Sequence, residues 1–88
     1  MKFNLGKVVA TPGAIVLLEQ NNQPASLFLA RHISGDFGDL DDEDCQANDE
    51  AIQYGNRILS SYILNGEKLW IITEADRSST CLLLPREY

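Results

Sequence analysis

Apolar residues in the first half of the chain recur every three or four positions, in three separate segments. This spacing is typical of helices that bury one face. Each segment also begins or ends at a residue suited to a helix end: Thr11 with Pro12 before the first, Gly35 after the second and Gly55 after the third. The pattern predicts short helices over residues 12–20, 24–33 and 41–54, with Asp39 or Asp41 as N-cap of the last.

The second half of the chain has the composition of strands around one strong turn signal. β-Branched and aromatic residues flank Asn65-Gly66, a dipeptide typical of two-residue type I′ hairpin turns. Such a turn pairs Leu64 with Glu67, Tyr62 with Leu69, Ser60 with Ile71, and Ile58 with Thr73. A further strand is predicted over residues 80–84, ended by Pro85, and a short edge strand over residues 6–10.

These elements predict a single α+β domain over residues 1–88: three short helices packed on a three- to four-stranded antiparallel β-meander with a C-terminal hairpin. The hairpin register makes both faces of the sheet apolar. One face carries Ile58, Tyr62, Leu64, Leu69 and Ile71, and the other carries Leu59, Ile63, Trp70 and Ile72. A sheet that meets water on one side normally alternates apolar and polar positions. Two interpretations stay open: helices cover both faces at the middle of the sheet, or the face with Trp70 is a self-association or partner surface.

Length and charge narrow the class of protein. Eighty-eight residues fit one core, and the formal net charge of -6 argues against direct binding to nucleic acid or to anionic membrane. No apolar run approaches the roughly 18 residues that a membrane span needs, and no segment has the pattern of a signal peptide. We therefore expect a cytoplasmic protein whose two cysteines, Cys45 and Cys81, are reduced thiols.

The acidic residues are concentrated in one segment. Of thirteen, eight fall between residues 36 and 50, where there is no Lys or Arg: Asp36, Asp39, Asp41, Asp42, Glu43, Asp44, Asp49 and Glu50. A helix dipole stabilises two or three acids in the first turn but not this many. The segment is either a solvated helix end or a negative surface that meets a basic partner. On the second interpretation, the partner-binding residues are Asp39, Asp41, Asp42, Glu43 and Asp44, together with Trp70 on the sheet. A homodimer through the sheet is a further expectation.

Metal and cofactor motifs are missing from the sequence. The acids lack the alternation of an EF-hand loop, and no CxxC or CxxH pair is present. Gly35 and Gly38 do not belong to a phosphate-binding loop. We predict no metal site, no cofactor and no catalytic residue.

His32 is the only histidine and precedes a loop with two glycines around Phe37. With Asp36 and Phe37 it forms a candidate ligand loop, and with Cys45 and Asp36 it suggests a nucleophilic trio. The simpler interpretation is structural: a histidine at a helix end bonds the last carbonyls or a nearby carboxylate and fixes the loop, while Phe37 folds back into the core.

Several blocks of the sequence are similar to those of one known family. They are residues 10–14, 30–32, 34–40, 46–49, 57–60, 70–77 and 83–85. On these blocks the chain, from about residue 6 to 88, resembles the small "plasmid-related proteins" of bacterial plasmids and integrated mobile elements. Some members carry a label as the modification subunit of a type I restriction enzyme. This chain has neither the glycine-rich cofactor loop nor the Asn-Pro-Pro-Tyr motif that such a methyltransferase requires.

The resemblance implies an accessory role in mobile DNA rather than a reaction. Together with the residues, it favours a small acidic protein-interaction or regulatory protein that is not an enzyme, with a defence inhibitor as the specific version. The alternative is a small ligand-binding protein or enzyme with its site at the loop of His32 and Asp36.

Overall fold

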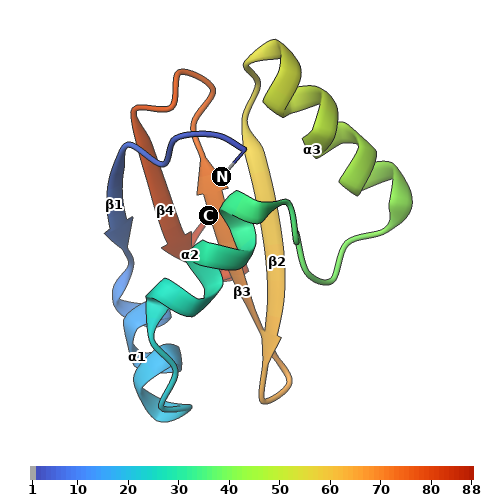
Figure 1. The fold of residues 1–88 in the computed structure, drawn as a ribbon. Coiled ribbons are helices and arrows are strands. Elements are labelled where there is room, and N and C mark those ends of the chain that lie inside the picture. The colour runs from blue at the N-terminus through green and yellow to red at the C-terminus, as the bar shows by residue number, and fades with distance from the viewer. Residues whose placement is uncertain (1) are drawn as a thin grey trace.

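Helices fill the first half of the chain and strands the second, apart from one N-terminal strand, in the computed structural model, which describes residues 2–88. The elements are β1 (Lys7–Ala10), α1 (Pro12–Gln20), α2 (Ala25–Ser34), α3 (Asp42–Tyr54), β2 (Ile58–Leu64), β3 (Glu67–Thr73), β4 (Ser79–Leu83) and the short 3₁₀ helix η1 (Pro85–Glu87) (Figure 1). The predicted α+β class is therefore confirmed. No helix within residues 2–88 combines the length and the apolar character needed to cross a membrane.

The helix ends lie where their capping residues indicate. The Thr11 hydroxyl accepts a hydrogen bond from the Ala14 N–H at 3.2 Å, and Asp41 accepts from the Asp44 N–H at 2.8 Å. α2 ends at Gly35, whose φ of 91° is in the left-handed region that favours glycine. These local signals act within one helical turn, so the sequence alone identifies them.

The four strands form one sheet in the order β1-β4-β3-β2. The predicted hairpin register is confirmed, with Leu64 opposite Glu67 and Ile58 opposite Thr73. The prediction of a purely antiparallel meander is wrong, because β1 pairs in parallel with β4. All four residues of β1 are exposed, so its sequence pattern has no buried side that would indicate a neighbour or a direction. The direction follows from the entry into α1, where the Thr11 N–H donates to the Leu82 carbonyl at 2.9 Å.

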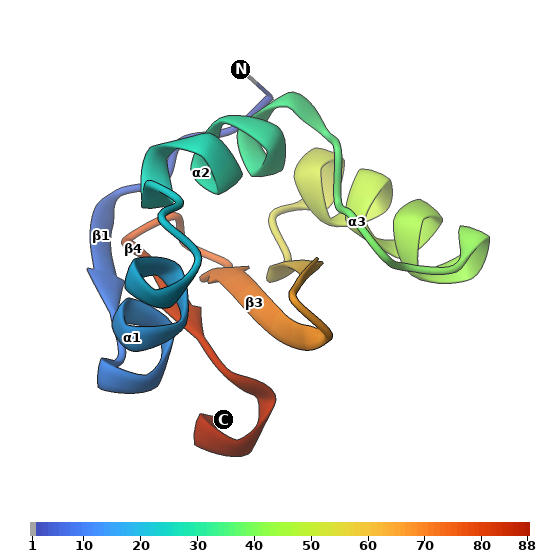
Figure 2. The ribbon, with the colours of Figure 1, turned by 90° about the horizontal axis from the view of Figure 1, so that it is seen from below.

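The helices pack on one face of the sheet only (Figure 2). Buried residues of α1 and α2, Ala14, Leu17, Leu18 and Phe28, meet Tyr62, Leu64, Leu69, Ile71 and Leu82 in the main core. A smaller core lies beneath α3, between Phe3, Phe37, Ala51 and Ile58. The interpretation that helices cover both faces is therefore wrong. The three helices pack on the first face and beside β2, so within residues 2–88 the opposite face is covered by η1 and Tyr88.

Candidate functional site

The predicted partner-binding acids lie together at one edge of the molecule, on α3 and the loop before it (Figure 1). We call the seven exposed acids here the acidic edge: Asp39, Asp41, Asp42, Glu43, Asp44, Asp49 and Glu50. The two ion pairs found within residues 2–88 join other residues, Arg31 with Asp36 and Arg57 with Glu74. The acidic edge thus carries negative charge that no cation of the described chain neutralises by contact.

α3 is held in place by contacts of its inner side. The Asn48 side-chain amide pairs with both main-chain groups of Leu59 in β2, donating to the carbonyl at 2.6 Å and accepting from the N–H at 3.0 Å. At the other end, the Arg77 guanidinium donates to the carbonyls of Ala51 and Asn56, at 2.9 and 2.6 Å. Because the helix is fixed at both its middle and its end, its outer acids point into solvent in a defined arrangement.

The charge of this edge acts on the one cysteine of α3. Burial first, and then the charges of Asp42, Asp49, Asp41 and Asp44, raise the pKa of the Cys45 thiol above its usual value. Cys45 is therefore a neutral thiol rather than the thiolate that nucleophilic chemistry needs. Two observations argue against the suggested nucleophilic trio of His32, Asp36 and Cys45. The thiol is neutral, and no hydrogen bond joins the three side chains.

Trp70 lies on the sheet face opposite the helices, which we call the open face. The face shows apolar side chains from all four strands and the C-terminus: Val9, Leu59, Ile63, Trp70, Cys81 and Tyr88 are exposed or partly exposed. Tyr88 contacts Trp70 edge-on with ring centroids 5.9 Å apart, and Arg57 donates to the Tyr88 hydroxyl at 2.7 Å. Trp70 and the acidic edge therefore belong to two separate surfaces, one on a face and one beside an edge.

The candidate ligand loop is folded onto the edge of β2. The Asp36 carboxylate bonds Arg31 at 2.7 Å, which is the main reason that its pKa is held below the usual value. Phe37 is buried in the smaller core, as predicted. A Cβ on Gly38 would lie 2.2 Å from the Ser61 carbonyl oxygen, so only glycine allows this approach.

His32 is buried between α2 and the sheet. Its ring forms hydrogen bonds with hydroxyl groups of the strands, and not with the helix-end carbonyls or the carboxylate that the sequence predicted. Its Nε2 lies 2.9 Å from Thr73 Oγ1, which lies 2.8 Å from Thr80 Oγ1. Thr80 donates to the Leu5 carbonyl at 2.7 Å. Because that carbonyl can only accept, the Thr80 proton is committed to it and Thr73 donates to Thr80. The His32 Nε2–H then donates to Thr73, and Nδ1 accepts from the Ser60 hydroxyl at 2.5 Å.

This network determines what His32 can do. The tautomer with the proton on Nε2 is the neutral ring, and burial lowers the pKa of His32 from 6.5 to about 4. A serine hydroxyl donating to a histidine nitrogen is also the first contact of a hydrolase nucleophile. Here both His32 and Ser60 are 0% exposed, so a substrate has no access to the pair. The arrangement stabilises the packing of α2 on the sheet.

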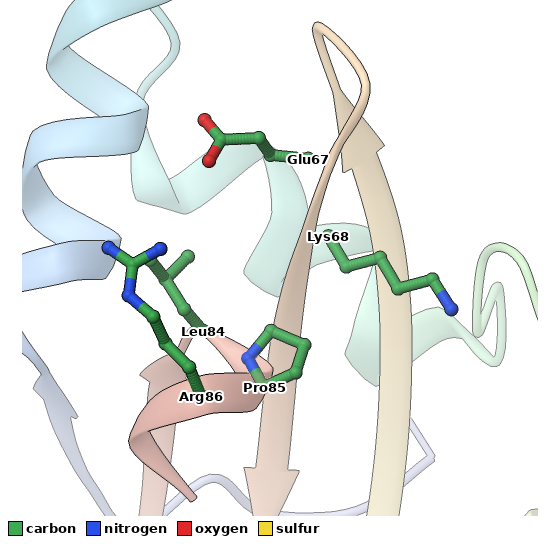
Figure 3. Close-up of a pocket in the computed structure, with 5 residues that line it drawn as sticks. All are labelled: Glu67, Lys68, Leu84, Pro85 and Arg86. Carbon is green, nitrogen blue, oxygen red and sulfur yellow. The ribbon is translucent and has the colours of Figure 1, made fainter.

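Two cavities of the described residues lie elsewhere, between α1, β3 and η1. One, of about 270 Å³, is lined by Glu67, Lys68, Leu84, Pro85 and Arg86 (Figure 3). The other, of about 340 Å³, shares Glu67, Leu84 and Arg86 and extends along α1. Neither is lined by His32, Asp36 or Phe37. Within residues 2–88 no three His, Cys, Asp or Glu side chains gather in a way that would hold a metal ion.

Sequence reasoning missed the residues that hold the site together. Asn48 and Arg77 act through main-chain groups that are close only after folding. The hydroxyl network had a visible signal, since Ser60 and Thr73 occupy positions that the hairpin register assigns to the apolar face. Buried polar residues at such positions require partners.

Comparisons with models of protein families, with curated proteins and with solved structures found no match.

Proposed function

We propose that the protein is a non-enzymatic interaction protein that binds a basic protein partner through the acidic edge. The observation that carries this proposal is a helix that hydrogen bonds of Asn48 and Arg77 anchor, and whose outer acids contact no cation of residues 2–88. Asp42 and Asp49 are seven residues apart on α3, as are Glu43 and Glu50, so each pair shares one side of the helix two turns apart. Acids spaced in this way can each contact a different basic side chain along an extended basic surface of the partner.

The solvated-helix interpretation accounts for only part of this surface. The N-terminal dipole stabilises Asp42, Glu43 and Asp44 in the first turn. Asp49 and Glu50 lie beyond that turn, where the dipole gives them little. Outside residues 36–50 the charges sum to 7 minus 5, or +2, so nearly all of the attraction for a cationic partner originates at this edge.

The open face with Trp70 supplies a second contact surface, for the same partner or for a second copy of the chain. The resemblance to plasmid-related proteins favours a regulatory accessory role in mobile DNA. In the specific version the basic partner is a defence protein and this chain is its inhibitor. At the alternative, a ligand site at His32 and Asp36, the His32 ring is 0% exposed and the Asp36 carboxylate is paired with Arg31, so we do not propose it.

The test is a matched pair of double variants. The tagged protein captures its partner from the host, and the purified pair is then measured by calorimetry. We expect Glu43→Gln/Glu50→Gln to weaken binding by about 5- to 30-fold, since exposed ion pairs contribute roughly 0.5 to 1 kcal/mol each. Glu19→Gln/Glu67→Gln removes the same charge from other elements and should leave the affinity within about twofold.

The dependence of the affinity on salt concentration distinguishes binding through the acidic edge from binding through the apolar open face. Affinity that depends on the acidic edge should fall as the ionic strength rises. If both double variants bind like the wild type, and Trp70→Ala alone abolishes binding, the acidic edge is only a solvated helix and the proposal is wrong.

A further inference from the structure

The two outer edges of the sheet differ in how they are covered. In β2 the residues whose main chain points outward are Leu59, Ser61 and Ile63. The Asn48 amide covers Leu59, and the loop before α3 covers Ser61, whose N–H donates to the Phe37 carbonyl at 3.0 Å. At the opposite edge, no segment of residues 2–88 pairs with the outer side of β1. Proteins normally blunt such an edge, because an uncovered strand is a template for another strand.

Strand geometry shows which groups of β1 are available. The Lys7 N–H donates to the Ser78 carbonyl and the Thr11 N–H to the Leu82 carbonyl, so residues 7, 9 and 11 face β4. The main-chain groups of Val8 and Ala10 alternate with these and point away from the sheet. Val8 and Val9 are 44% and 41% exposed, one on each face of the strand. β1 therefore offers both hydrogen-bonding groups and apolar side chains.

Charge indicates what can occupy this edge. β1 has no acid, and it is the sheet edge opposite the one against which α3 packs (Figure 1). Two molecules of net charge -6 repel each other least when their acidic edges are as far apart as the fold allows. Pairing at β1 meets this condition, because each acidic edge then lies beyond the fourth strand from the contact. A contact through β2 would instead bring the two acidic edges together.

A two-fold axis at Val9 satisfies the main-chain groups as well. In this antiparallel register Val8 pairs with Ala10 of the partner copy, and Val9 faces Val9 across the axis. Lys7 then faces Thr11 rather than another lysine. An apolar cross-strand pair at the centre stabilises the contact, and α1, which follows β1, exposes Ile15 and Val16 at 44% and 49%.

We propose that β1 pairs with β1 of a second copy, so that two four-stranded sheets form one continuous eight-stranded sheet. The dimer presents two acidic edges, related by two-fold symmetry, at its two ends. If the proposed function holds, on which this step rests, the dimer is bivalent and suits a basic partner that itself has two equivalent sites. The self-pairing does not depend on that function.

The test is the molar mass of the purified chain by sedimentation, from about 5 to 500 µM, because a four-residue strand makes a small and weak interface. We expect the wild type to approach the dimer mass at the upper end. Val8→Pro removes an N–H that points outward and makes no bond to β4, and it should keep the protein monomeric. Val8→Thr keeps the N–H and should dimerise like the wild type.

A second variant guards against misfolding of the proline variant. Val9→Lys leaves every main-chain group in place but sets two cations across the axis, and it should also be monomeric. Ile63→Lys places the same charge on the open face, away from β1, and should still dimerise. Circular dichroism verifies the fold of each variant.

Three results would overturn the inference: a wild type that is monomeric at 500 µM, a dimer that survives both Val8→Pro and Val9→Lys, or a dimer lost only in Ile63→Lys. A monomeric wild type that still binds its partner through the acidic edge would refute the β1 dimer but support the proposed function. A β1 dimer without affinity for a basic partner would support the dimer but refute the proposed function.

Discussion

Acid should destabilise the fold through His32. The buried ring is neutral, with its Nε2–H donated to Thr73 and its Nδ1 accepting from Ser60. A second proton on the ring puts a charge in the core with no carboxylate in contact, and Ser60 must then turn its hydroxyl to accept. The pKa of His32 is accordingly lowered from 6.5 to about 4 by burial. Between these values the unfolded chain binds more protons than the folded protein, so stability is complete above pH 6.5 and falls as the pH drops toward 4.

The size of this effect follows from the shift. At pH 4.5 the unfolded histidine is almost fully protonated and the folded one is mostly neutral, which gives a loss on the order of 2 to 3 kcal/mol relative to pH 7.5. A domain of this length has a total stability of roughly 4 to 13 kcal/mol. The loss caused by protonation of His32 is therefore a sizeable fraction of the total stability.

The assay is urea unfolding of the wild type and of His32→Gln at pH 7.5, 6.5, 5.5 and 4.5. Glutamine keeps part of the hydrogen bonding and does not titrate, so the variant should lose about 1 to 3 kcal/mol at pH 7.5. The difference between the two proteins should then shrink by about 2 to 3 kcal/mol on going to pH 4.5, since carboxylates elsewhere contribute equally to both. Parallel pH curves for the two proteins would refute the reasoning, because the ring would then titrate alike in both states.

Three further predictions concern the contacts that shape the surfaces. Asn48→Ala leaves two main-chain groups of β2 without their partner and should cost about 1 to 3 kcal/mol in urea unfolding, while an unchanged midpoint would mean that water replaces the amide fully. Gly38→Ala should be much more destabilising than Gly66→Ala, because both residues have positive φ but only the first Cβ meets a carbonyl, that of Ser61 at 2.2 Å; equal losses would contradict this. Glu87→Gln should lower the melting temperature at pH 7, because hydrogen bonds from Thr11, Leu84 and Gly13 hold the pKa of this carboxyl below its usual value; the difference from the wild type should shrink as the pH falls below 4.5 through that lowered pKa.

Much of the local structure was predictable from short segments of the sequence. The register of the hairpin follows from Asn65-Gly66, because a two-residue turn leaves one way to pair the flanking strands. The start of α1 at Thr11 and the end of α2 at Gly35 follow from hydrogen bonds and backbone angles within one turn. The exposure of the acids was also predictable, since charged side chains without partners stay in water.

Only the tertiary structure decided the features that join distant segments. The bonds of His32 reach 28 and 41 residues along the chain, and nothing near His32 in the sequence indicates a strand hydroxyl as its partner. The parallel placement of β1 and the amide contact of Asn48 with β2 likewise depend on where the helices bring the chain. Periodicity shows that a face is apolar but not which element covers it, so the choice between a covered and an open face with Trp70 was decided only when three short helices were all found on one side of the sheet.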